Sequence, residues 1–271
     1  MSGRLVVCPT PIGNLDDVTL RVLRVLGEAD LIACEDTRRT RVLLERHGVV
    51  GGGRLVSYHE HNERARAAEL VERIGSGAVV ALVSDAGMPG VSDPGWLLVR
   101  GCAEAGARVE VLPGASAVPA AVVVSALPAG RWRFVGFLPR RAGDLTGMWD
   151  AAETTVAFES PQRLGKSLAS LAATDPARPV AVCRELTKVH EEVVRGSAHA
   201  LAERYAAAAP RGEIVVVFGA AGRAAPELCA ATAAVRRLVD AGARTRPAAS
   251  VVAELTGTSA NALYRALTAG D

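Results

Sequence analysis

The sequence predicts an α/β protein made of two consecutive α/β domains and a C-terminal helical hairpin. Three observations support this prediction. Short apolar runs alternate with helical patterns, the alternation breaks at Pro113-Gly114, and the chain becomes alanine-rich and helical from Ala224 onward. A chain of 271 residues is long enough for two domains of ordinary size. We therefore expect domains at residues 1–113 and 114–222, followed by a helical module at residues 223–271.

The first domain contains five apolar, mostly β-branched runs separated by amphipathic stretches. The runs are residues 4–8, 31–34, 54–58, 78–83 and 108–113. Continuous apolar strands that alternate with helices are typical of a parallel sheet covered by helices on both faces. We therefore expect a doubly covered parallel sheet over residues 1–113.

The second domain begins with a helical pattern at residues 116–127. Five strand patterns follow, at residues 133–138, 154–159, 179–186, 189–196 and 213–219, with a helical pattern at residues 161–173 between the second and the third. The last three strand patterns indicate an antiparallel portion. We expect the final strand pattern to close the second domain.

The C-terminal stretch has two short apolar faces around a turn at Gly257. The apolar positions are Val251, Val252, Leu255, Leu263 and Leu267, a spacing that resembles a helix-turn-helix. Its second helix carries a single cation, Arg265, so a capping or RNA-facing hairpin is favoured over a DNA reader. We expect no DNA partner.

Charge and cysteine usage limit the classes of protein. The net charge is only +2, but 29 of the 31 basic residues are arginine, the exceptions being Lys166 and Lys188. Arginine suits bidentate phosphate contacts, although codon bias explains the same composition. Five dispersed cysteines with no C-x-x-C favour free thiols in a reducing cytoplasm. No apolar run approaches the ~18 residues of a membrane span, so we expect a cytoplasmic protein with no membrane partner.

Three glycine- and proline-rich stretches follow predicted strands. They are "CPTPIGNLDD" (residues 8–17), "SDAGMPGVSDPG" (84–95) and "PGASA" (113–117). Glycine lets the backbone approach a ligand closely, and open parallel sheets bind ligands at the carboxyl ends of their strands. The sequence therefore predicts a small-molecule site where these three loops converge.

Two polar stretches, "CEDTRRT" (34–40) and "YHEHNE" (58–63), also follow predicted strands. His59 and His61 are two residues apart in a loop, and the spacing of a calcium loop is absent, so we expect no metal. Arginines are crowded between residues 38 and 73. This mixture predicts a site that binds a phosphate-bearing substrate and orients one of its hydroxyls.

The stretch "SPQRLGKS" (160–167) matches the end of a phosphate-binding loop only superficially. Ser160 stands where the first glycine of such a loop must be, and Ser160 followed by Pro161 is typical of a helix start. No G-x-G-x-x-G opens a helix either. We therefore expect neither a nucleoside-triphosphate site nor a dinucleotide site.

Eight ordered blocks between residue 9 and about residue 217 carry a family resemblance. They are "PTPIGNLDDVTLR", "ACEDTRRT", "YHEHNE", "VALVSDAGMPGVSDPG", "LPGASA", "GFLP", "FESPQRL" and "RELTKVHEEVVRG". Together they resemble the ribosomal RNA small-subunit methyltransferase I family of the tetrapyrrole methylase superfamily. The resemblance implies S-adenosylmethionine-dependent methylation of a cytidine ribose 2′-hydroxyl in 16S rRNA, in the decoding region of the small subunit. It also implies a homodimer whose two α/β domains hold the donor in the cleft between them.

The loops and the resemblance together predict the donor site. We expect it to contain Ile12, Gly13, Asp85, Ala86, Gly87, Met88, Val91, Ser92, Ala115, Ser116, Ala117, Phe158, Glu185, Gly212, Glu213 and Ile214. Two positions depart from the family pattern, because Met88 replaces the usual threonine and Gln162 the usual histidine. We therefore assign no proton transfer to Gln162.

Substrate-binding residues are expected in the two polar stretches and the arginines near them. Candidates for orienting or deprotonating the ribose hydroxyl are Glu35, Asp36, His59 and Glu60, and the sequence does not choose among them. We expect RNA phosphates to contact Arg38, Arg39, Arg41, Arg64, Arg66, Arg140 and Arg141. Two alternatives stay open: a methylase of a corrin-type macrocycle, and a non-catalytic regulator that binds nucleic acid through the C-terminal hairpin.

Overall fold

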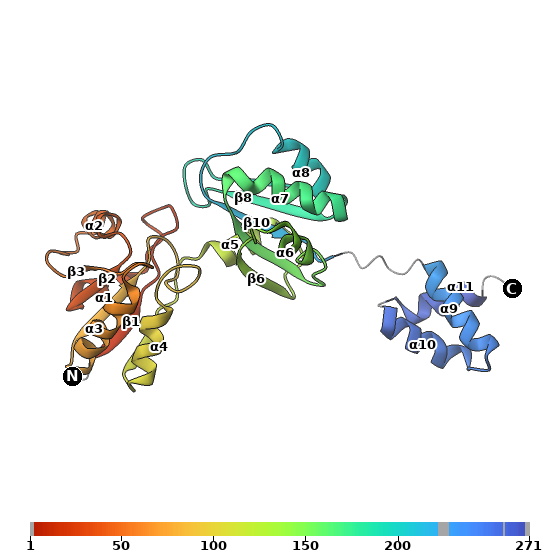
Figure 1. The fold of residues 1–271 in the computed structure, drawn as a ribbon, viewed down its shortest axis with the longest axis horizontal. Helices are drawn as coiled ribbons and strands as arrows, with labels where there is room; N and C mark the ends of the chain where they lie inside the picture. Colours follow the sequence, from red (N-terminus) through yellow and green to blue (C-terminus); the bar gives the residue numbers. More distant parts are fainter. Residues whose placement is uncertain (1–2, 222–227, 257, 269–271) are drawn as a thin grey trace. The chain divides into compact units, whose positions relative to one another are not determined.

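The computed structural model describes residues 3–221, 228–256 and 258–268 (Figure 1). One compact unit contains residues 1–149 and 153–219, and a second contains residues 150–152 and 220–271. The larger unit holds two separate five-stranded sheets. The expected fold class, two α/β domains followed by helices, is confirmed. The expected boundary between residues 222 and 223 lies outside the described residues.

The first sheet is parallel throughout and has the strand order β3-β2-β4-β1-β5. Its strands are β1 (Arg4–Val7), β2 (Leu31–Cys34), β3 (Leu55–Ser57), β4 (Val79–Val83) and β5 (Arg108–Val111). Leu5 of β1 pairs with Val80 of β4, and Ala33 of β2 pairs with Leu82 of β4. The strands β1, β2 and β4 are therefore central, and they are apolar, as expected for a sheet covered on both faces.

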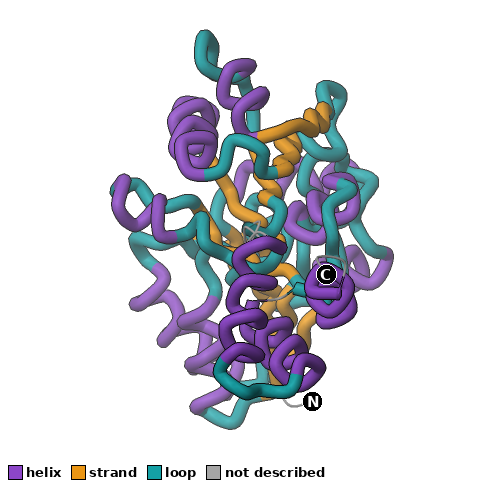
Figure 2. Tube along the Cα trace, turned by 90° about the vertical axis from the view of Figure 1, so that its right-hand side faces the viewer, coloured by secondary structure: helices purple, strands orange, loops and turns teal. Residues whose placement is uncertain are grey.

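Helices cover both faces of this sheet. They are α1 (Leu20–Glu28), α2 (Thr37–Arg46), α3 (Glu63–Gly75) and α4 (Trp96–Glu104). Leu70 of α3 and Leu98 of α4 are buried in a core on one face, while Val22 and Leu26 of α1 and Leu44 of α2 are buried in a core on the other. Figure 2 shows loops joining helices and strands along the chain. The doubly covered parallel sheet is confirmed.

The second sheet is mixed and has the order β6-β7-β10-β8-β9. Its strands are β6 (Trp132–Phe137), β7 (Thr154–Glu159), β8 (Pro179–Arg184), β9 (Glu192–Ser197) and β10 (Ile214–Phe218). Only β6 and β7 are parallel; β10 is antiparallel to both β7 and β8. The antiparallel portion is confirmed, but the last strand lies in the middle of the sheet. Val216 and Val217 are consequently fully buried.

Helices pack on both faces of the second sheet as well. They are α5 (Ala117–Ser125), α6 (Ala142–Gly147), α7 (Pro161–Thr174) and α8 (Ala198–Arg204). The helix α5 packs against β7, β8 and β10. The helices α6, α7 and α8 contribute to the core on the opposite face, where Trp149 and Phe218 are in contact at a ring-centroid distance of 5.1 Å.

The glycine of "SPQRLGKS" has a packing role in α7. A Cβ atom on Gly165 would lie 2.5 Å from the carbonyl oxygen of Tyr205, at the end of α8. Glycine at this position therefore lets α7 and α8 approach each other closely. Ser160 is the N-cap of α7 and Pro161 its first residue, as expected for a helix start.

We predict that Gly165→Ala destabilises the protein although alanine is the better helix former. Overpacking against a backbone carbonyl costs about 1–3 kcal/mol, which exceeds the gain of about 1 kcal/mol in helix propensity. Gly75→Ala in α3 is the matched control, because a Cβ there meets nothing within 4 Å. Urea unfolding should show a lower midpoint for the first variant and an unchanged or higher midpoint for the second. The opposite order would contradict the packing role of Gly165.

The C-terminal unit has a small core of its own. Its helices are α9 (Leu228–Asp240), α10 (Thr245–Thr256) and α11 (Ala260–Thr268). Val235, Val252 and Leu263, one from each helix, are buried together. The expected hairpin corresponds to α10 and α11, and α9 packs against both. The expected turn residue Gly257 lies outside the described residues.

Candidate active site

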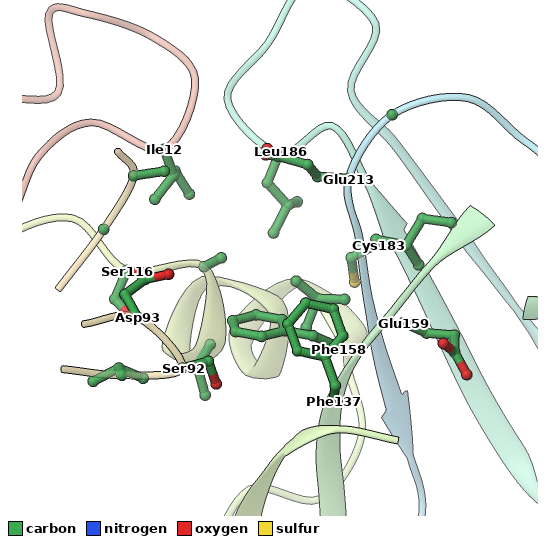
Figure 3. A pocket seen from close by; sticks show the side chains of 18 of the residues that line it. Ile12, Ser92, Asp93, Ser116, Phe137, Phe158, Glu159, Cys183, Leu186 and Glu213 are labelled. Atoms are coloured by element: carbon green, nitrogen blue, oxygen red, sulfur yellow. The ribbon is translucent and has the colours of Figure 1, made fainter. Parts of the chain in front are cut away.

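A cavity of about 360 Å³ lies in the larger unit, between loops of the first sheet and strands of the second (Figure 3). One side is formed by the loops after β1 and β4 and by the start of α5, and the other by β6, β7, β8 and the start of β10. The lining residues are Ile12, Ala86, Gly87, Met88, Val91, Ser92, Asp93, Ser116, Ala117, Val118, Phe137, Phe158, Glu159, Ser160, Pro161, Cys183, Leu186, Gly212, Glu213, Ile214 and Val215.

Gly87 joins the loops after β1 and β4. Its N–H donates to the Thr10 carbonyl at 2.9 Å, and its own carbonyl accepts from the Thr10 N–H at 2.9 Å. Gly87 has φ +78°, in the left-handed region that side chains other than glycine rarely adopt. The positive φ of Gly87 and its two hydrogen bonds with Thr10 fix the backbone of both loops at the cavity.

The loop that follows is held in an unusual backbone shape. Gly90, Ser92 and Gly95 have φ values of +82°, +65° and +147°. A left-handed conformation at a residue other than glycine costs about 1–3 kcal/mol and persists only where its surroundings impose it. The strained Ser92 places the next residue, Asp93, at the cavity, on the same side as Ile12 and Ser116 (Figure 3).

Asp93 has an unusual electrostatic environment for a carboxyl group. Burial and the nearby carboxylates Glu35, Asp85 and Glu213 raise the pKa of Asp93 to about 7. A carboxyl group that must be desolvated beside like charges favours its protonated form. Asp93 is therefore a titratable group in the neutral range inside the cavity.

The opposite wall is mostly apolar. Phe158 contacts Phe134 and Phe137, with ring centroids 5.0 Å and 5.5 Å apart. Cys183 lies on the same wall, and burial raises the pKa of its thiol to about 11. A thiol with that pKa stays protonated at neutral pH and does not act as a nucleophile. This wall therefore offers a surface for an apolar or aromatic group.

A second strained loop closes one edge of the cavity. Glu185 and Thr187 have φ values of +53° and +67°. The Thr187 hydroxyl accepts from the Asn14 N–H at 3.0 Å, which links the loop after β8 to the loop after β1. The Lys188 Nζ donates to Glu185 at 2.8 Å and to Glu213 at 3.0 Å. Hydrogen bonds from Lys188 and from the Glu213 N–H keep the pKa of Glu185 below its usual range.

A smaller cavity of about 260 Å³ adjoins the first. The two cavities share Ile12, Ala86 and Glu213, and the smaller one also has Asp85, Arg39 and Lys188 in its lining. Asp85 accepts from the Asp36 N–H at 2.9 Å and lies 3.5 Å from the Arg39 guanidinium. The smaller cavity is thus the more strongly charged of the two.

The structure brings most of the expected donor residues together. In the lining of the larger cavity are Ile12, Ala86, Gly87, Met88, Val91, Ser92, Ser116, Ala117, Phe158, Gly212, Glu213 and Ile214. Gly13 and Asp85 line the smaller cavity. Ala115 packs in the apolar cluster around Ile12, and Glu185 lies beside Glu213 through their hydrogen bond.

Sequence reasoning missed several lining residues. Phe137 and Leu186 belong to the quoted blocks "GFLP" and "RELTKVHEEVVRG", and Asp93 to "SDPG", but none received a role. Glu159, in "FESPQRL", is buried and accepts from the Ser160 N–H at 2.8 Å and from the Ser167 hydroxyl at 2.5 Å. These residues could have been predicted from the sequence, because all of them lie within the quoted blocks.

The four expected hydroxyl-orienting residues lie outside the linings of both cavities. Asp36 is the N-cap of α2, and hydrogen bonds from Arg38 lower the pKa of Asp36 to about 2. Glu35 is half-buried, and burial followed by the charge of Asp85 raises its pKa. The His59 N–H donates to the Asn62 side chain at 2.9 Å, and Glu60 is exposed. Their catalytic roles stay predictions.

The expected RNA-binding arginines lie on three segments. Arg38, Arg39 and Arg41 are exposed on α2, Arg64 and Arg66 lie in the first turns of α3, and Arg140 and Arg141 are exposed before α6. Arg38 pairs with Asp36 at 2.8 Å and Arg66 with Glu69 at 2.6 Å. Within the described ranges, Arg41, Arg64, Arg140 and Arg141 make no ion pair.

The described residues contain neither a metal-binding cluster nor a membrane-spanning helix. In residues 3–221, 228–256 and 258–268, no group of three or more His, Cys, Asp or Glu residues could hold a metal ion. In the same part of the chain, no helix is long and apolar enough to cross a membrane.

The fold is that of a class of methylases. The family model described as "Tetrapyrrole (Corrin/Porphyrin) Methylases" matches residues 4–202. The chain resembles the solved uroporphyrin-III-C-methyltransferase from Thermus thermophilus, with a TM-score of 0.58, 22% identity and coverage of 80% of this chain and 94% of that one. It also resembles diphthine synthase, with a TM-score of 0.62, 19% identity and coverage of 80% and 90%. Methyltransferases of this family use S-adenosylmethionine.

The names of curated relatives indicate one family within this class of methylases. Three proteins called "Ribosomal RNA small subunit methyltransferase I" come from Mesorhizobium japonicum, Mycobacterium tuberculosis (strain H37Rv) and Thermotoga maritima. The first is 45% identical over 97% of this chain and 90% of its own length. The second is 46% identical over 93% and 90%, and the third 42% identical over 80% and 98%. The chain belongs to the ribosomal RNA small subunit methyltransferase I family of tetrapyrrole methylases.

Proposed function

We propose that the protein transfers a methyl group from S-adenosylmethionine to a cytidine ribose 2′-hydroxyl in the decoding region of 16S rRNA. The names of the relatives support the small ribosomal subunit as substrate. The resemblance of the eight sequence blocks supports the cytidine 2′-oxygen. The observation that carries the donor assignment is the cavity of about 360 Å³ beneath the glycine-bearing loops.

The residues of the cavity fit this donor. Its volume is within the usual range for small-molecule sites, which is roughly 300–1,000 Å³. Gly87 leaves room for a ligand where a side chain would stand, and the Phe158 wall offers an apolar surface. Glu213 provides negative charge for a cationic ligand. We propose that the donor is held by these groups and by the other expected donor residues, with Gly13, Asp85, Ala115 and Glu185 supporting them from the rim.

S-adenosylmethionine, when bound, supplies an electrophilic methyl group. The chain's own residues then have to hold a ribose hydroxyl in line with it and exclude water, because correct placement alone contributes several kcal/mol to such a transfer. We propose that the smaller cavity admits the target nucleotide. Arg39 and Lys188 line that cavity and can face a phosphate of the nucleotide.

Incubation with labelled S-adenosylmethionine tests the proposal. The substrates are small ribosomal subunits that lack the modification and, in a parallel reaction, a tetrapyrrole. We expect label in 16S rRNA, on a ribose 2′-oxygen of a cytidine, as located by nuclease digestion and mass spectrometry. Label in the tetrapyrrole would favour a macrocycle methylase. Binding of the subunit without any label transfer would favour a nucleic-acid-binding regulator.

The arginines of the expected RNA surface should make subunit binding depend on salt. Each phosphate contact lowers the logarithm of affinity by roughly 0.7 to 0.9 per tenfold increase in salt. Replacing Arg41 and Arg64 together by glutamine should therefore reduce the salt slope by about 1.5. Arg100→Gln is the control, because Arg100 is paired with Glu104 at 2.6 Å on α4. An unchanged slope in the double variant would remove these two arginines from the RNA surface.

We also propose that the protein works as a homodimer, which the family resemblance implies. Light scattering of the purified protein should then give about twice the mass of one chain, which is 28.1 kDa. A mass equal to one chain at micromolar concentration would contradict this proposal.

A further inference from the structure

Asp93 differs from the other carboxylates around the two cavities because it has no partner. It makes no hydrogen bond and no ion pair with any described residue, yet it lines the larger cavity. Its place follows from the strained backbone at Ser92 and the glycines on either side of it. Strain of this kind is retained where a side chain must be held in one position.

The groups around Asp93 come from three elements. Glu35 follows β2, Asp85 follows β4, and Glu213 precedes β10. The cations nearby are engaged with other carboxylates, since Arg39 lies 3.5 Å from Asp85, and Lys188 binds Glu185 and Glu213. Asp93 therefore faces three negative charges and no cation that is dedicated to it.

We propose that Asp93 is the catalytic residue that accepts the proton of the attacking ribose hydroxyl, a role that rests on the proposed methyl transfer. The O–H bond breaks and its proton goes to the Asp93 carboxylate. The ribose oxygen uses the electron pair left behind to bond the methyl carbon, and the sulfur of the donor keeps the pair of the broken carbon–sulfur bond. The protonated Asp93 returns its proton to water after the product leaves.

The surroundings of three other carboxylates make them poorer proton acceptors. Asp36 caps α2 and is bound by Arg38, which holds its pKa at about 2. Asp85 already accepts from the Asp36 N–H and faces Arg39. Glu60 is exposed and lies outside the linings of both cavities. A general base is most effective when its pKa is near the working pH, and the pKa of Asp93, at about 7, meets that condition.

The test compares Asp93→Asn with Glu72→Gln, an exposed carboxylate on α3 that serves as the control. At saturating donor and pH 8, we expect methylation of the small subunit by Asp93→Asn to be about a hundredfold slower. Donor affinity measured by calorimetry should change less than about threefold. Glu72→Gln should match the wild type in both measurements.

The pH profile and the stability provide independent readouts. Turnover of the wild type should rise about tenfold per pH unit up to about pH 7 and then level off, because the ionised carboxylate is the base, and Asp93→Asn should lack this rise. A raised pKa in the folded state means that the folded protein binds the extra proton between about pH 4 and pH 7. As the pH rises from about 4 to about 7, the melting temperature of the wild type should therefore fall relative to that of Asp93→Asn.

Several outcomes would overturn the inference. If Asp93→Asn methylates the subunit at the wild-type rate, Asp93 is not the proton acceptor, and the proposed function is unaffected. A tenfold or larger loss of donor affinity with unchanged turnover at saturation would make Asp93 a donor-binding group instead. Parallel melting temperatures of the two proteins from pH 4 to pH 8 would show that Asp93 titrates normally. Failure of the wild type to methylate the subunit would overturn the proposed function and this inference together.

Discussion

Gly87→Val should abolish measurable binding of S-adenosylmethionine. Gly87 has φ +78°, and a side chain in that region costs about 1–3 kcal/mol, with β-branched residues at the upper end. The valine side chain would also enter the cavity that Gly87 lines, with its Cβ 3.5 Å from Ile12. The backbone strain lowers the stability of the fold, whereas the valine side chain in the space of the donor lowers affinity. A steric penalty of about 3 kcal/mol corresponds to roughly a hundredfold loss of affinity. Calorimetry on the folded variant checks the expectation.

Gly106→Val separates the loss of binding from the loss of stability. Gly106 has φ +68°, close to that of Gly87, but a Cβ there meets nothing within 4 Å, and it lies in the turn between α4 and β5. The control should lose a similar amount of stability and keep wild-type donor affinity. If Gly87→Val folds and still binds the donor normally, the loop after β4 is not part of the donor site.

The first sheet could be predicted because its signals are local. Strands such as Val79–Val83 are apolar throughout, and each is followed by a helix with its own periodicity. The carboxyl ends of parallel strands meet at one edge, so the glycine loops after β1 and β4 could be placed together before the structure was known. The reciprocal pairing of Thr10 with Gly87 is the contact that this rule implies.

The second sheet was harder to predict because its order depends on contacts between distant residues. The strand β10 inserts between β7 and β8, and Val216 pairs with both Ala157 and Val182. An apolar run of this kind does not by itself say whether the strand lies at the centre or at the edge of the sheet. The wall formed by Phe137 and Leu186 follows from this arrangement, which explains why neither residue was expected in the cavity.

The role of Asp93 could not be predicted for an electrostatic reason. Its pKa depends on burial and on Glu35, Asp85 and Glu213, which come from three different loops. The sequence instead drew attention to Asp36, which is followed in the chain by the cations Arg38 and Arg39. Those neighbours stabilise the charged form of Asp36 and make it the weaker base.

Gly13→Val should disable the enzyme by forcing apart the two loops at the cavity edge. A Cβ on Gly13 would overlap the Lys188 side chain and lie 2.7 Å from the Thr187 hydroxyl and 3.0 Å from the Leu186 carbonyl. The backbone of the loop after β8 would have to move by about an ångström, a displacement that costs roughly a hundredfold in rate. The hydrogen bond from Asn14 to Thr187 would break as well, adding about fivefold.

Two further variants make the Gly13 prediction specific to the contact between the loops. Thr187→Val removes only the hydrogen bond, so kcat/KM should fall about fivefold. Gly52→Val is the control for adding the side chain, because a Cβ on Gly52 meets nothing within 4 Å. Its kcat/KM and donor affinity should equal those of the wild type. We expect the graded order Gly52→Val, Thr187→Val, Gly13→Val in loss of kcat/KM. Equal activity of all three folded variants would show that the two loops separate during turnover without loss, and the contact would then have no role in holding the donor.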